Sequence, residues 1–168
     1  MATMHVDEIK ALARQAHGDP RLREQLFADM MGEDRDAAVH AAWTLTHLPK
    51  EDNSYIADHR ETLAQKAIAT PDTSQRRLSL ALTERIDWTN ETPSEYFMRL
   101  LDFCLEHLMR RDEPYGVRSL CMKIAYKLSL PYPELQEELR QSLLLLEPSE
   151  LGAGVLHTRN KLLKIIRT

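Results

Sequence analysis

Residues 34–48 of this 168-residue chain read DRDAAVHAAWTLTHL. Apolar side chains recur in this stretch at spacings of three and four, which is the pattern of one face of an α-helix. These positions are Val39, Ala42, Leu45 and Leu48. Asp34 precedes the run as a helix cap, and Pro49 ends it. The stretch therefore predicts a short amphipathic helix.

The same periodicity recurs along nearly the whole chain, and no segment has a convincing strand pattern. A second clear example is residues 112–128, DEPYGVRSLCMKIAYKL. Breaks at Gly, Pro and short polar loops divide the chain into a cap helix and a series of helix pairs. We expect the cap helix over about 3–17 and the pairs over about 20–49, 54–87, 94–130 and 133–167, with one continuous helix from 55 to 69.

The second helices of these pairs end at regular intervals. They end on Leu48, Ile86, Leu128 and Ile166, which are 38, 42 and 38 residues apart. Two helices per unit of about 40 residues is typical of an α-solenoid, in which each pair needs its neighbours to cover its apolar surface. The predicted fold is all-α: one α-α superhelical domain over residues 1–168, with about four helix pairs and an N-terminal cap helix.

The two quoted stretches resemble the second helix of a HEAT repeat. That helix typically opens with Asp or Pro, continues with Val-Arg and then runs through Ala and Leu. In residues 112–128 the matching positions are Asp112, Pro114, Val117, Arg118, Ala125 and Leu128. In residues 34–48, His40 stands in the place of the arginine, and the units at 71–86 and 150–167 match less well. The resemblance covers about residues 20–166 and implies a HEAT or armadillo-like solenoid whose second helices line a concave face.

Bulk composition fits an ordinary globular protein. Hydrophobic residues make up 43% and charged residues 29%, and the net charge of −4 lacks the basic excess of a general nucleic-acid binder. The N-terminus is polar and amphipathic, and no apolar run approaches the roughly 18–20 residues that span a bilayer. We therefore expect no signal peptide, no membrane partner and a cytoplasmic protein.

Residue clusters that could carry chemistry favour structural roles. His40 and His47 lie two turns apart on one face, about 10 Å by helical rise, too far to share a metal ion. Asp102, Glu106 and His107 suit a solvated face, where Arg99 and Arg110 can pair with the carboxylates. Cys104 and Cys121 fall in apolar helical patterns as buried, reduced thiols, and no Cys-x-x-Cys motif is present. We predict no metal site and no cofactor, and a non-enzymatic role is favoured over an enzyme.

Charge placement gives the most informative functional signal. Residues 115–129 carry basic side chains and no acids, the final helix is also basic, and the helix between them is acidic. With the HEAT resemblance, this implies a basic concave surface that binds a protein or acidic peptide, or less favourably a nucleic-acid backbone. Uncorrelated, solvated charges are the alternative. The candidate contacts are His40, Thr44, His47, Arg76, Arg118, Lys123, Lys127, Lys161 and Lys164, and Arg77 and Arg85 could extend them.

Two alternatives remain open. Leu162, Leu163, Ile165 and Ile166 cover a broad arc of the final helix, which either packs deeply or contacts a second copy of the chain. The second concerns activity: HEAT-like alkylpurine DNA glycosylases hold a duplex on a concave basic surface. In that reading Trp43 and Trp88 supply the aromatic side chains and Asp87 the carboxylate.

Overall fold

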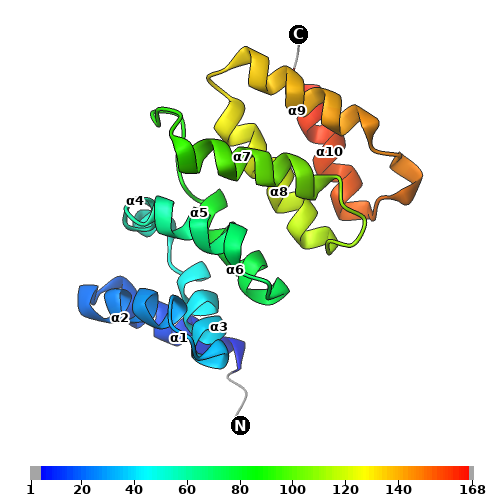
Figure 1. The fold of residues 1–168 in the computed structure, drawn as a ribbon. Helices are drawn as coiled ribbons and strands as arrows, with labels where there is room; N and C mark the ends of the chain where they lie inside the picture. Colours follow the sequence, from blue (N-terminus) through cyan, green and yellow to red (C-terminus); the bar gives the residue numbers. More distant parts are fainter. Residues whose placement is uncertain (1–4, 167–168) are drawn as a thin grey trace. The chain divides into compact units, whose positions relative to one another are not determined.

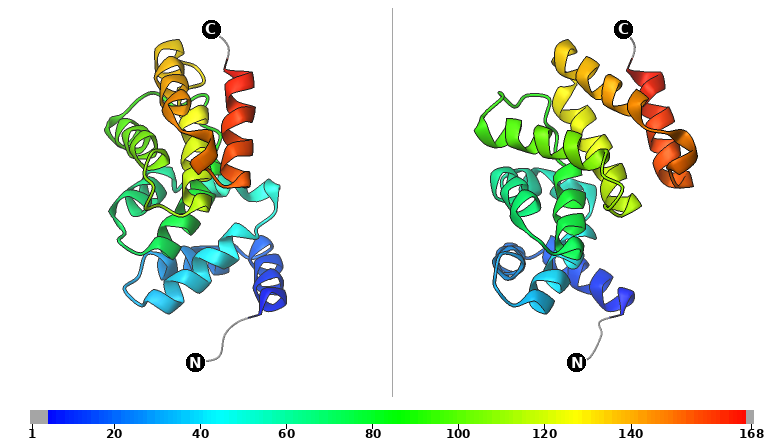
Figure 2. Two further views of the ribbon diagram at one scale, coloured as in Figure 1. Left: turned by 90° about the vertical axis from the view of Figure 1, so that its right-hand side faces the viewer. Right: turned by 45° about the vertical axis from the view of Figure 1, so that its right-hand side comes forward.

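The computed structural model describes residues 5–166, and every regular element in that range is helical (Figures 1 and 2). The chain divides into two compact units, Met1–Ile86 and Asp87–Thr168. The division falls where the sequence predicts the boundary between the second and third helix pairs. The all-α prediction is thus confirmed, and the units are described separately below.

The first unit contains the cap helix and two helix pairs. Helix α2 packs against α3, α5 against α6, and α3 against α6, while α1 contacts both α2 and α3. Side chains of this unit's second helices, such as Leu45 and Leu82, are fully buried. The elements are α1 (Val6–His17), α2 (Pro20–Met30), α3 (Arg35–Thr46), the 3-10 turn η1 (Lys50–Asp52), α4 (Asn53–Ala57), α5 (Arg60–Ala69) and α6 (Thr73–Glu84).

The second unit contains the other two pairs. Helix α7 packs against α8, and α8 in turn packs against both α9 and α10. In Figure 2, α10 runs beside α8. Phe97, Leu100 and Ile124 belong to the buried core. The elements are α7 (Glu95–Leu108), α8 (Tyr115–Ser129), α9 (Pro133–Leu145), the 3-10 turn η2 (Pro148–Glu150) and α10 (Ala153–Ile165).

Short polar side chains cap several helices, as the sequence predicts for Asp34. Asp34 accepts a hydrogen bond from the backbone N–H of Ala37 at 3.2 Å. Asp72 does the same for Gln75 at 3.0 Å, and Ser94 for Phe97 at 3.4 Å. Each bond satisfies a donor that the first turn of a helix leaves unpaired.

The prediction of one continuous helix over 55–69 is wrong. Asp58 and His59 separate α4 from α5, and the backbone leaves the helical conformation at His59. The His59 ring stacks on Phe27 of α2, with ring centres 4.0 Å apart, and the Arg60 Nε donates to the Ala57 carbonyl at 2.8 Å. Tertiary packing against α2 therefore overrides the local helical pattern.

Arginines join successive helices in both units. In four pairs of consecutive helices, an arginine of the later helix donates to a carbonyl at the C-terminal end of the earlier one. Carbonyls near the C-terminal end of a helix generally lack a partner in the next turn and lie at the negative end of the helix dipole, so a guanidinium suits them in both respects. The arginines are Arg23, Arg76, Arg118 and Arg159, and their acceptors are the carbonyls of Ala16, Thr70, Leu108 and Leu143.

The residues that mark the predicted repeat period occupy equivalent positions. Each lies within two residues of the end of a second helix, and each is at most 4% exposed. They are Leu48, Ile86, Leu128 and Ile166. A period of about 40 residues in the sequence thus corresponds to one helix pair in the structure.

Candidate functional site on the second helices

Two exposed lysines lie on neighbouring second helices of the Asp87–Thr168 unit. Lys123 is on α8 and Lys161 is on α10, and these two helices pack against each other. Within residues 5–166, neither lysine makes an ion pair or a side-chain hydrogen bond. Their ammonium groups therefore remain open to an acidic partner.

The other predicted lysines differ in their surroundings. Lys127 is half-buried on α8, and Lys164 is exposed on α10. Both already interact with other groups of the chain. Of the four predicted lysines, Lys123 and Lys161 are therefore the two that are exposed and have no partner among the described residues.

The α-helical acidic side chains of this unit all lie on its first helices, α7 and α9. Glu134 and Glu138 of α9 are exposed, and Glu137 pairs with Arg140 of the same helix at 3.0 Å. Helices α8 and α10 begin with no acidic residue in their first turns. The charge difference between first and second helices that the sequence predicts is therefore present here.

Arg76 and Arg118 have structural contacts that the sequence reasoning missed. The Arg76 Nη2 donates to the Thr70 carbonyl at 2.9 Å, and the Arg118 Nε donates to the Leu108 carbonyl at 3.0 Å. Arg118 is only 4% exposed. Their position near the start of the second helix, after a turn, is the signal that could have identified this role.

The predicted contacts on α3 are also largely occupied by local interactions. Thr44 is fully buried, and its hydroxyl donates to the His40 carbonyl at 2.8 Å, so it presents no polar group at the surface. The His47 Nδ1 lies 3.0 Å from the Trp43 carbonyl oxygen. His40 is half-buried, and no side-chain hydrogen bond of its ring is present in the described range.

Arg77 and Arg85 have contrasting environments on α6 and at its end. Arg77 is exposed, whereas Arg85 donates to the Pro49 carbonyl and to the Asn53 Oδ1, each at 2.8 Å. Burial lowers the pKa of the Arg85 guanidinium below its ordinary value. Arg85 thus secures the connection between α3 and α4 and is not a surface contact.

The cluster near the end of α7 only partly matches its predicted solvated face. Asp102 and Glu106 are exposed, as expected. His107 instead is buried, with its Nδ1 2.6 Å from the Glu113 Oε2 and its ring stacked on Phe103. Sequence spacing within one helix could not identify Glu113, because it follows the helix in the next turn.

Arg110 also pairs differently from the prediction. It forms an ion pair with Asp112, two residues away, at 2.6 Å, and not with the carboxylates of α7. Its hydrogen bonds lower the pKa of Asp112 to about 2, and Asp112 raises the pKa of Arg110. Both side chains are substantially exposed, so the pair contributes little to stability.

The two cysteines lie in the core of the Asp87–Thr168 unit, as the sequence predicts. Cys104 and Cys121 are free and buried, and burial raises the pKa of the Cys104 thiol, with a further contribution from Cys121. No group of three or more His, Cys, Asp or Glu side chains within residues 5–166 could hold a metal ion. None of the helices described there is long and apolar enough to cross a bilayer.

Trp88, one of the residues that the sequence suggests for a glycosylase, is buried in the core of its own unit. Trp88 is 1% exposed, and its ring lies edge-on to Phe97 with centres 6.1 Å apart. The Asp87 carboxylate accepts hydrogen bonds from both the backbone N–H and the hydroxyl of Thr89. Trp88 is therefore a core residue of its own unit and does not present a face on which a base could stack.

The final helix, α10, buries part of its apolar arc against its neighbours. Leu162 and Ile166 are 5% and 4% exposed, while Ile165 is 48% exposed. The first of the two alternatives for this helix, close packing against its neighbours, thus applies to most of its apolar residues.

Comparison with known proteins agrees with this arrangement of paired helices. The family model of the HEAT repeat domain matches residues 1–166. No curated protein and no solved structure matches the chain. The matched region spans both compact units and all of the helix pairs. The chain therefore belongs to the HEAT repeat domain family.

Proposed function

We propose that this HEAT-repeat chain is a non-enzymatic scaffold that binds an acidic protein or peptide through its second helices. The observation that carries the proposal is the pair of exposed lysines, Lys123 and Lys161, on two packed second helices. Because neither has a partner within the described residues, binding an anion costs no existing ion pair. The acidic residues of α9 add specificity by repelling acidic partners from that helix.

The negative net charge of the chain favours a protein partner over nucleic acid. The net charge is −4, and long-range attraction to a polyanion as dense as DNA requires a basic excess. A local basic surface suits a short acidic segment of a protein. This proposal places the chain in the cytoplasm, where buried thiols such as Cys104 and Cys121 stay reduced.

The test measures binding of a fluorescent acidic peptide, such as an oligoglutamate, by anisotropy at low salt. We expect Lys123→Ala/Lys161→Ala to weaken binding about tenfold, because each lysine at the contact contributes a charge interaction. The control is Lys10→Ala/Lys50→Ala, which removes the same charge from exposed positions outside the second helices. An equal loss in both double variants would show that net charge alone governs binding, and the proposal would fail.

A second arm of the experiment replaces the peptide with a short DNA duplex. We expect weak binding that the Lys123→Ala/Lys161→Ala variant does not change. Tight duplex binding that falls steeply as salt rises would instead support the DNA-binding alternative.

A second candidate partner is another copy of the chain, which would bind through α10. The 48% exposure of Ile165 is the specific observation that favours it. Light scattering on the wild-type chain and on Ile165→Glu distinguishes the two cases: a mass that halves in the variant indicates self-association through α10.

A further inference from the structure

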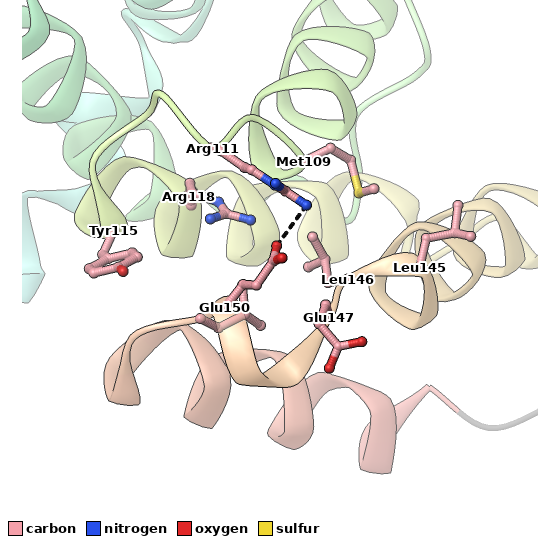
Figure 3. Close-up of a pocket in the computed structure, with 9 residues that line it drawn as sticks. Met109, Arg111, Tyr115, Arg118, Leu145, Leu146, Glu147 and Glu150 are labelled. Carbon is pink, nitrogen blue, oxygen red and sulfur yellow. Dashed lines mark ion pairs between the residues drawn. The ribbon is translucent and has the colours of Figure 1, made fainter.

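The Asp87–Thr168 unit contains a pocket that the second-helix lysines do not line. It lies between the turn that joins α7 to α8 and the connection from α9 to α10, and has a volume of about 270 Å³ (Figure 3). Its lining includes Met109, Arg111, Tyr115, Arg118 and Leu145. We call it the Arg118 pocket. Its volume is just below the range of roughly 300–1,000 Å³ typical of small-molecule sites, so it suits a group about the size of one amino-acid residue.

The Arg118 guanidinium supplies a buried positive charge at this pocket. Arg118 is 4% exposed, and its Nε donates to the Leu108 carbonyl, which fixes the orientation of the group. Its two terminal nitrogens have no hydrogen-bond partner among the residues that the structure describes, and Figure 3 shows them directed toward Arg111 and Glu150. These nitrogens are not among the fully buried, unpaired polar atoms of the described residues, so an anion or water that enters the pocket can accept their hydrogen bonds.

Arg111 can supply a second cation at the mouth of the pocket. It pairs with Glu150 at 2.8 Å, but the two side chains are 80% and 46% exposed. Exposed pairs of this kind contribute little free energy, so an incoming carboxylate can replace Glu150 at little cost. The two arginines would then face one carboxylate, the group that a guanidinium binds best through paired N–H donors.

Apolar side chains surround these charges. Leu145 and Tyr115 line the pocket and are 76% and 56% exposed, which is unusual for large apolar residues unless they belong to a binding surface. Met109 and Leu146 add further apolar lining. The ligand must therefore combine an anionic group with an apolar one.

The carboxylates at the rim select among anionic ligands. Glu147 and Glu150 both line the pocket, and they would repel a doubly charged phosphate more strongly than a singly charged carboxylate. Once Arg111 turns to the ligand, the same carboxylates can pair with a basic residue that precedes the ligand's apolar group. This combination corresponds to the end of a peptide chain.

From this geometry we infer that the Arg118 pocket binds the carboxyl terminus of a peptide whose last residue is apolar. The terminal carboxylate binds Arg118 and Arg111, and the last side chain contacts Met109 and Leu146. The preceding residues lie along Leu145 and Tyr115, so they add contacts that a free amino acid cannot make. This inference is separate from the second-helix lysines and does not depend on the function proposed for them.

The first test compares three probes by calorimetry with the wild-type chain. They are the acetylated hexapeptide Gly-Ser-Lys-Ala-Gly-Leu with a free carboxyl terminus, the same peptide as its amide, and N-acetyl-leucine. We expect the acid to bind about tenfold more tightly than either of the others, since the amide lacks the charge and N-acetyl-leucine lacks the preceding residues. Equal binding of acid and amide would overturn the inference. Binding of N-acetyl-leucine as tight as that of the peptide would identify a small-molecule site and overturn the peptide assignment.

The second test uses matched substitutions on neighbouring residues. Leu145→Glu places a negative charge at the pocket, whereas Leu144→Glu places it on the adjacent exposed residue that does not line the pocket. Both side chains are exposed, so we expect both variants to fold. Leu145→Glu should weaken binding of the peptide acid about tenfold and Leu144→Glu less than about twofold, because solvent screens the more distant charge. Equal effects of the two substitutions would contradict the assigned site.

Arg118→Gln tests the central contact, with circular dichroism to check the fold. We expect it to remove the preference for acid over amide, and a folded variant that keeps the preference would overturn the inference. If the loss of the Leu108 contact unfolds the chain, the comparison of Leu145→Glu with Leu144→Glu still shows whether the peptide binds at the Arg118 pocket. Lys123→Ala/Lys161→Ala should leave peptide binding unchanged, which keeps a failure here distinct from a failure of the proposed function.

Discussion

Asp72 shows how one residue can stabilise two helices. Its Oδ1 accepts from the Gln75 N–H at 3.0 Å and caps α6, while its Oδ2 accepts from the Arg35 Nε at 2.5 Å and ties α6 to α3. The backbone hydrogen bond from Gln75, together with Arg35, holds the pKa of Asp72 below its ordinary value of 3.8. The ionised form is therefore the one that stabilises the fold.

Replacing Asp72 separates its capping role from its charge. We expect Asp72→Ala to lower the free energy of unfolding by about 1 kcal/mol at pH 7, because the cap is lost. Asp72→Asn should cost less, because asparagine also caps helices well. The measurement is urea denaturation followed by circular dichroism.

The lowered pKa of Asp72 predicts that the stability of the fold depends on pH. Because the folded pKa of Asp72 is depressed, its stabilisation is fully present above its ordinary pKa of 3.8 and is lost as the pH falls through the lower folded value. Asp72→Asn should therefore lose less stability than the wild type on going from pH 7 to pH 3. Identical losses would show that the carboxylate charge does not stabilise the fold.

At the level of single residues, the sequence predicts local roles much better than long-range ones. Asp34 as a cap and the two buried cysteines follow from short-range patterns, and both are confirmed. The pairing of His107 with Glu113 depends on how the chain turns after α7, which periodicity within the helix does not reveal.

At the level of elements, an arginine that donates hydrogen bonds to carbonyls earlier in the chain has a structural role, whereas an exposed arginine without such bonds does not. Arg85 donates to Pro49 and Asn53 and lies close to the end of α3, whereas its neighbour on α6, Arg77, is exposed. An arginine and a lysine carry the same charge, but lysine lacks the fixed fork of donors that serves several acceptors at once.

This contrast gives a matched pair of substitutions. We expect Arg85→Lys to lower the free energy of unfolding by about 2 kcal/mol, since hydrogen bonds from a charged group to half-buried acceptors are lost. Arg77→Lys should change it by less than about 0.5 kcal/mol, as is usual at exposed positions. Chemical denaturation of both variants provides the comparison, and equal costs would show that Arg85 has no special structural role.

The elements that the sequence predicts best are those with strong helical periodicity and clear breaks. The pairs α2–α3 and α7–α8 lie close to their expected bounds for this reason. The break between α4 and α5 could not be predicted, because it depends on the stacking of His59 on Phe27, 32 residues earlier. Likewise, the basic character of α8 and α10 was visible in the sequence, but the burial of Arg118 required the tertiary structure.

At the level of the whole molecule, the chain divides into two compact units, each with a buried core and one tryptophan. Trp43 belongs to the Met1–Ile86 unit and Trp88 to the Asp87–Thr168 unit. The sequence predicts one repeat domain over residues 1–168 and places the boundary between its second and third helix pairs near residue 87. The contacts within the chain divide the two units at this predicted boundary.

The two tryptophans allow the units to be followed separately. Trp88→Phe leaves Trp43 as the reporter, and Trp43→Phe leaves Trp88. When the core substitution Leu45→Ala is added to each, we expect the denaturation midpoint reported by Trp43 to fall more than that reported by Trp88. Leu45 is fully buried in the first unit, and truncating such a residue costs about 2–5 kcal/mol locally. Equal shifts would instead show that the two units unfold as one.

The most direct test of the central claim, that the second helices capture an acidic protein partner, is co-purification from the native cell. Tagged wild-type chain, Lys123→Ala/Lys161→Ala and the charge-matched Lys10→Ala/Lys50→Ala are compared by quantitative mass spectrometry. We predict that the wild type and the matched control enrich the same acidic proteins, and that the second-helix variant loses them. Unchanged enrichment by Lys123→Ala/Lys161→Ala would contradict the account.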